Sequence, residues 1–64
     1  MNQNQKRSLS VKEKSDLILR ALVGEKAIDA WWNSPNKAFG MQKPIDVPAI
    51  EVFNYLLDQM EAPH

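Results

Sequence analysis

The feature that most constrains this chain is its shortness combined with a complete absence of cysteine. It has 64 residues and no Cys, so neither a disulfide nor a thiolate metal site supplements its core. A domain of this size buries only about 60% of the surface that its unfolded chain exposes. Its core then supplies a net stability of roughly 3–5 kcal/mol. We therefore expect one domain that depends on tight helical packing and on partner binding.

Hydrophobic periodicity predicts an amphipathic helix over residues 11–23. Ser10 and Glu13 have the spacing of a capping box, which favours a helix that begins just after Ser10. Gly24 favours a break before a second helix over residues 25–32. A continuous helix through Gly24, at a cost of about 1 kcal/mol, stays open as an alternative.

A third amphipathic helix is predicted over residues 48–60, because Pro48 suits a first helical turn. No segment has the alternation of a strand. The expected apolar faces comprise Val11, Leu17, Ile18, Ala21 and Leu22 in the first helix, Val23, Ala27, Ile28 and Trp31 in the second, and Ile50, Val52, Phe53, Leu56, Leu57 and Met60 in the third.

These elements predict an all-α fold, a small three- to four-helix bundle with a loop rich in Pro, Asn and Gly between the second and third helices. Residues 1–9 are expected to form a flexible polar N-terminal arm, and residues 10–62 a helical domain.

The two tryptophans are adjacent, and neighbouring helical residues point about 100° apart. Trp31 lies near the middle of the second apolar stripe and Trp32 at its edge. We therefore expect Trp31 in the core and Trp32 on a half-covered rim.

The connection after Trp32 contains the signals of two tight turns. Ser34 is expected to cap a single helical turn with Pro35 at its first position. Phe39 would then point inward and Gly40 would end the turn. Pro44 is expected to start a second tight segment.

Charge argues against nucleic acid as the main partner. Eight basic and eight acidic residues give a formal net charge of zero, whereas nucleic-acid binders usually carry a basic surplus. Basic residues concentrate near the start, and after Lys43 there is no Lys or Arg. This asymmetry reads either as ordinary solvated helix faces or as a means of orienting the chain on a partner. The early basic residues are Lys6, Arg7, Lys12 and Lys14.

An enzyme is not expected. The one histidine, His64, is the last residue, and no Asp, Glu and His residues have the spacing of a metal site. Gly24 and Gly40 do not form a phosphate loop, so we expect no cofactor. No apolar run reaches the roughly 18 residues of a membrane span, and the first ten residues lack a signal-peptide core. We expect a soluble, cytoplasmic protein.

The chain has more large apolar side chains than a domain of this size can hide. Trp, Tyr and Met are enriched in contact surfaces, and Trp32, Met41 and Tyr55 are the expected exposed members of this set. An alternative is that they shield the core without binding anything.

The stretch AWWNSPNKAFGMQKP, Ala30 to Pro44, resembles the toxin-binding domain of Xre/MbcA/ParS-type antitoxins. The resemblance extends over roughly residues 11–60, although Trp32 stands where Leu is usual and the link after Pro44 is short. The residues that carry the motif, together with Trp32, are Trp31, Pro35, Asn36, Ala38, Phe39, Gly40 and Pro44. We expect these seven to set the fold.

The resemblance implies a small helical domain that binds a cognate toxin, typically a RES-domain enzyme that consumes NAD, and blocks its active site. About ten residues precede the first expected helix, too few for the DNA-binding domain that many members carry. The residues expected to face the partner are Trp32, Lys37, Met41, Tyr55, Asp58, Glu61 and His64. Two alternatives stay open. One is a phage-encoded or homo-oligomeric regulator that binds an unrelated host protein, and the other is weak nucleic-acid binding through the early basic residues.

Overall fold

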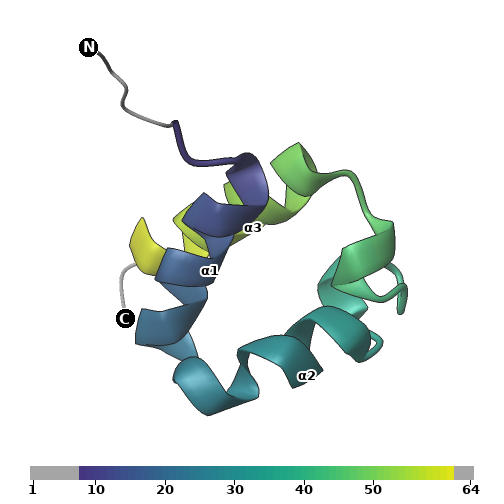
Figure 1. The fold of residues 1–64 in the computed structure, drawn as a ribbon. Coiled ribbons are helices and arrows are strands. Elements are labelled where there is room, and N and C mark those ends of the chain that lie inside the picture. Colours follow the sequence, from purple (N-terminus) through teal and green to yellow (C-terminus); the bar gives the residue numbers. More distant parts are fainter. Residues whose placement is uncertain (1–7, 62–64) are drawn as a thin grey trace, which may run out of the picture.

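The computed structural model describes residues 8–61, and the regular structure in this range consists of helices without a strand (Figure 1). The prediction of an all-α fold with three helices is confirmed. Those helices are α1 (Val11–Leu22), α2 (Ile28–Asn33) and α3 (Ala49–Glu61), and three single 3₁₀ turns join them: η1 (Glu25–Ala27), η2 (Lys37–Phe39) and η3 (Pro44–Asp46). None of the helices in this range is long and apolar enough to cross a membrane.

The predicted capping box begins α1. The backbone N–H of Glu13 donates to Ser10 Oγ at 3.1 Å, and the backbone N–H of Ser10 donates to Glu13 Oε1 at 2.8 Å. After Leu22 the chain leaves the helix, and Gly24 has a φ of 88°, which glycine adopts readily because it has no Cβ. The break at Gly24 is thus confirmed, and the alternative of a continuous helix is wrong.

Most of the core forms where α1 packs against α3, with α2 and the 3₁₀ turns covering one side of this pair (Figure 1). Leu19 and Val52 are completely buried, and Leu56 nearly so. Ser15 is also fully buried, and its hydroxyl donates to the carbonyl oxygen of Val11. The buried apolar residues are Ile18, Leu19, Trp32, Val47, Val52 and Leu56.

The apolar face predicted for α3 is wider than the buried one, and the face predicted for α1 leaves out Leu19, which is fully buried. Leu17 is 50% exposed, and Ile50 and Met60 are more than half exposed. The reason is rotation: α1 buries Ile18 and Leu19, and Leu17 lies about 200° from Leu19 around the helix. The sequence pattern therefore identified the helices but misplaced the centre of the α1 face.

The positions of the two tryptophans are the reverse of the prediction. Trp32 is 3% exposed and belongs to the core, whereas Trp31 is half-buried against it. The prediction of a rim position for Trp32 is wrong because α1 lies on that side of α2. The indole Nε1–H of Trp32 donates to Asp16 Oδ1 at 2.7 Å, and Lys12 Nζ lies 4.9 Å from the centre of a Trp32 ring.

The loop uses Asn36 where the sequence predicted Ser34 as the cap. Asn36 Oδ1 accepts the backbone N–H of Ala38 at 2.9 Å at the start of η2. Ser34 instead donates its hydroxyl to the carbonyl oxygen of Ala30 at 2.7 Å, which closes the end of α2. Gly40 ends η2 with a φ of 63°, and Phe39 packs inward against the core as expected.

The second tight segment begins at Pro44, as predicted. Pro44 is buried at the start of η3, and Val47, just after this turn, is a core residue. Pro44 has no N–H to leave unpaired, and its fixed φ suits a first helical position. The loop therefore returns to the core before α3 begins.

Candidate functional site

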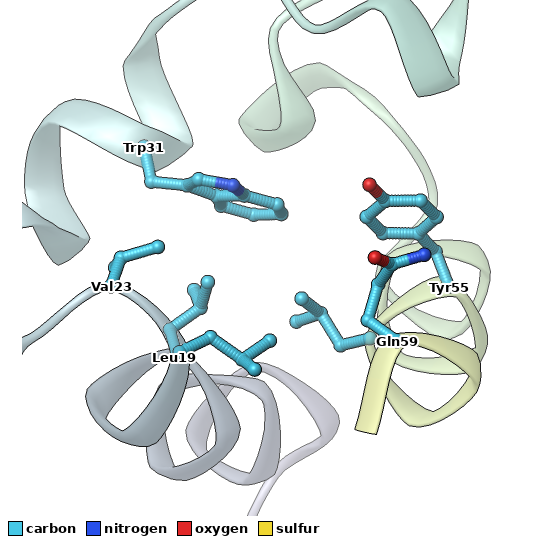
Figure 2. Close-up of a pocket in the computed structure, with 7 residues that line it drawn as sticks. Leu19, Val23, Trp31, Tyr55 and Gln59 are labelled. Carbon is cyan, nitrogen blue, oxygen red and sulfur yellow. The ribbon is translucent and has the colours of Figure 1, made fainter. Parts of the chain in front are cut away.

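An apolar groove of about 260 Å³ opens between the end of α1, the middle of α2 and the second half of α3 (Figure 2). Leu19 and Leu56 are buried and form its floor. Three separate elements build it, so no one helix defines it. The lining residues are Leu19, Leu22, Val23, Trp31, Tyr55, Leu56 and Gln59.

Two aromatic rings face each other across this groove. Figure 2 shows the Trp31 indole extending over the groove from α2, with Tyr55 and Gln59 on the opposite side from α3. On the α1 side, Leu22 is 45% exposed and Val23 40% exposed. The groove therefore presents apolar side chains to solvent along its open edge.

Phe39 connects the two aromatic walls from outside the groove. Its ring makes an edge-on contact with Tyr55 at a centroid distance of 5.2 Å and with Trp31 at 6.5 Å. Trp31 also makes an edge-on contact with Trp32 at 5.3 Å. Such edge-to-face pairs each contribute about 0.5–1.5 kcal/mol beyond area burial. The loop thus holds the rings of both walls in place.

The buried Trp32 anchors α2 on α1 through a polar contact. Asp16, which accepts the Trp32 N–H, also pairs with Lys12 at 3.3 Å. A buried indole N–H without an acceptor carries a desolvation penalty of about 1–3 kcal/mol. Asp16 removes this penalty and fixes the rotation of α2, which turns Trp31 toward the groove.

Carboxylates border the α3 wall. Glu51 and Asp58 lie four residues before and three residues after Tyr55, a spacing that makes them neighbours of Tyr55 on the helix surface. Both are exposed, and neither has an ion-pair partner within residues 8–61. The last turn of α3 contains no basic residue. The α3 surface beside Tyr55 therefore carries two exposed carboxylates, although neither lines the groove.

The residues predicted to face a partner are only partly brought together. Tyr55 lines the groove and Asp58 lies beside it, whereas Trp32 is buried and cannot present its ring to a partner. Lys37 and Met41 are exposed in the loop but do not line the groove. Glu61 is exposed at the end of α3, and His64 lies outside the described residues.

The seven residues of the predicted fold-setting motif divide between the groove and the loop. Trp31 lines the groove, and Phe39 contacts both of its aromatic walls. The remaining five shape the connection: Asn36 caps η2, Gly40 ends it and Pro44 begins η3, while Pro35 and Ala38 are exposed.

Sequence reasoning missed five lining residues as site residues, namely Leu19, Leu22, Val23, Leu56 and Gln59. The sequence pattern placed Leu22 and Val23 on buried faces. Their position just before Gly24 nevertheless indicated exposure, because neighbouring elements bury a helix end less completely than its middle. Gln59 carried no signal, since a polar residue on an exposed helix face is ordinary.

The groove can bind an apolar side chain, but its lining contains no acid–base pair or nucleophile with a base. Across residues 8–61, no group of three or more His, Cys, Asp or Glu residues is arranged to hold a metal ion. Comparison with known protein families, with curated proteins and with solved structures finds no match to this chain.

Proposed function

We propose that this chain is a protein-binding module that neutralises an intracellular toxin enzyme by covering its active site. The proposed toxin is of the RES type, which consumes NAD, and the chain contributes no chemistry of its own. The groove between α1, α2 and α3 binds one apolar surface of the toxin.

The observation that carries this proposal is the open apolar groove itself. In a domain with so few buried residues, Leu22, Val23 and Trp31 keep exposed apolar surface beside an empty volume of about 260 Å³. Burying apolar surface contributes about 25 cal/mol per Å², so a partner side chain that fills the groove gains free energy from both surfaces.

The resemblance to the toxin-binding domain of Xre/MbcA/ParS-type antitoxins supports the choice of partner. Its motif includes Trp31, which lines the groove, and Phe39, which contacts the rings of both aromatic walls. The motif thus supplies one aromatic wall of the groove and the ring that contacts both walls, as well as the turns of the loop.

The test is inhibition of a purified RES-domain enzyme, followed as the rate of NAD consumption while the chain is titrated in. We expect the rate to fall toward zero. The double variant Leu22→Ser/Val23→Ser should need at least about tenfold more protein for half inhibition, because a loss of about 1.4 kcal/mol is a factor of ten.

Leu17→Ser is the matched control. Leu17 is on the same helix and is 50% exposed, but it does not line the groove, so this variant should inhibit like the parent chain. Circular dichroism would verify that all variants keep their helices. If the parent chain leaves NAD consumption unchanged, the toxin proposal is wrong. If Leu17→Ser weakens inhibition as much as the double variant, the groove is not the binding surface.

A further inference from the structure

We infer that the groove selects a cationic amphipathic helix, with one large apolar side chain in the groove and Lys or Arg residues beside it. This inference rests on the proposed function, since it describes the segment of the partner that docks there. It adds the chemistry by which that segment is recognised.

The size and shape of the groove define the apolar part of the ligand. A cavity of about 150 Å³ accommodates a benzene molecule, so the 260 Å³ groove has room for an aromatic or a large aliphatic side chain. Its open side lies between helices, and grooves of this kind take the apolar face of a partner helix. The Trp31 and Tyr55 rings lie on opposite sides of the groove, so that side chain would contact aromatic surface from both α2 and α3 (Figure 2).

The unpaired carboxylates of α3 define the charge of the ligand. Glu51 and Asp58 do not line the groove but are exposed neighbours of Tyr55 on the α3 surface, and neither has an ion-pair partner in the described part of the chain. The Tyr55 hydroxyl and the Gln59 amide likewise have no hydrogen-bond partner there. Basic residues on either side of the apolar anchor would each meet one of these carboxylates, which are seven residues apart on α3.

The dipole of α3 reinforces the negative charge near Asp58, whereas Glu51 lies in the first turn at the opposite, positive end of the helix. The groove is lined by the last turns of α1 and α3, and a helix C-terminus carries roughly half a negative charge. Arg20 compensates α1, whereas α3 has no basic residue in its last turn and carries Asp58 and Glu61 there. The uncompensated negative end is therefore that of α3, so the cations of the ligand should lie on the α3 side.

The probes are three synthetic 15-residue amphipathic helices. Fluorescence anisotropy measures the affinity of each probe for the full chain, and NMR chemical-shift changes locate its binding site. The first has a Leu and Phe face flanked by Lys. In the second, Glu replaces every Lys. In the third, Ser replaces the apolar anchors. We expect the first to bind with shifts at Val23, Trp31 and Tyr55, and the other two to bind at least about tenfold more weakly.

The variant Glu51→Gln/Asp58→Asn tests the carboxylates. Exposed ion pairs contribute about 0.2–1 kcal/mol each, so this variant should weaken the first peptide about fivefold and reduce its salt dependence. Asp29→Asn/Asp46→Asn removes the same charge at exposed positions that lie outside α3 and are not helix neighbours of Tyr55. This control should bind nearly like the parent chain.

Equal binding of the Lys and Glu peptides, equal losses in the two carboxylate variants, or shifts that map away from the groove would each overturn the inference. These outcomes are distinct from failure of the toxin proposal. An RES enzyme that is inhibited through the groove, while the peptides bind without regard to charge, would leave the function standing and remove only the inference. Charge-selective peptide binding without inhibition of the enzyme would remove the toxin proposal and leave the inference about the ligand standing.

Discussion

Trp32 combines two roles in one side chain, because its ring fills the core and its N–H satisfies Asp16. We predict that Trp32→Ala unfolds the domain. Losing a buried Trp costs about 3–5 kcal/mol, which equals the roughly 3–5 kcal/mol that a core of this size supplies. Far-ultraviolet circular dichroism at 25 °C measures the loss of helix directly.

Trp31→Ala is the matched control, since the two residues are adjacent and chemically identical. Trp31 is only half-buried and lines an open groove, so this variant should keep its helices while losing affinity for the partner. A helical Trp32→Ala beside an unfolded Trp31→Ala would show that the burial of the two rings is assigned the wrong way round.

Met41 is held in a backbone conformation that suits glycine or asparagine better. Its φ is 69° and its side chain is 58% exposed, and a left-handed conformation costs an ordinary residue about 1–2 kcal/mol. We predict that Met41→Asn raises the free energy of unfolding by about 1 kcal/mol, measured by urea denaturation, because Asn tolerates this region. Backbone strain of this kind is common at functional sites. The affinity of the same variant for the partner therefore tests whether Met41 contacts the partner.

Gly40→Ala is the matched comparison, and we expect it to lower the free energy of unfolding. Gly40 has a φ of 63°, and a Cβ placed there would meet nothing within 4 Å. A loss of about 1 kcal/mol would then come from the backbone conformation alone. If both variants leave the unfolding free energy unchanged, the left-handed pair at the loop tip is not strained.

At the residue level, local chemistry was predictable and long-range contacts were not. The capping box and the break at Gly24 depend on neighbours within a few residues, and both follow from the sequence. The choice between Trp31 and Trp32 depends on Asp16, which is sixteen residues away. Adjacent helical residues point about 100° apart, which shows that only one of the two can face the core, but not which.

At the scale of elements, the capping box in the first turn contributes to the stability of α1. Ser10 and Glu13 satisfy backbone N–H groups reciprocally, and α1 supplies one side of the main packing contact. We predict that Ser10→Ala lowers the free energy of unfolding by about 1 kcal/mol in urea denaturation, because the cap hydrogen bond is lost.

Ser34→Ala is the matched comparison for this cap. The Ser34 hydroxyl bonds to a carbonyl at the exposed end of α2, so its removal leaves only an exposed acceptor that water satisfies. We expect a change of less than about 0.5 kcal/mol. A larger loss for Ser34→Ala than for Ser10→Ala would contradict the assignment of the two caps.

Sequence periodicity predicted the helices but not their rotation about their own axes. In α3 the apolar residues cover half of the helix wheel, so the pattern alone does not select which part faces α1. Val52 and Leu56 are buried, whereas Ile50 and Met60 at the edges stay more than half exposed. The rotation is set by contact with α1, a property of the pair.

At the scale of the whole molecule, the core and the groove form one continuous apolar region. Leu19 and Leu56 belong to both, since each is buried in the core and also forms the groove floor. The sequence indicated an excess of apolar side chains over buried positions, but a groove built by three separate elements has no local signature. The proposed binding at the groove would therefore be coupled to the stability of the fold.

This coupling predicts that partner binding raises the free energy of global unfolding, by an amount that grows with the logarithm of the free partner concentration. At a free partner concentration of about 100 times Kd, a ligand that binds only the folded state adds about 2.7 kcal/mol, close to the roughly 3–5 kcal/mol expected of the domain itself. Amides that exchange through global unfolding, such as those of Leu19 and Leu56, should then exchange about 100-fold more slowly in hydrogen-exchange measurements.

Because Leu22→Ser/Val23→Ser removes the exposed rim of the groove, it should lose most of this protection at the same partner concentration, while Leu17→Ser retains it. Equal protection in both variants would place the partner elsewhere on the molecule.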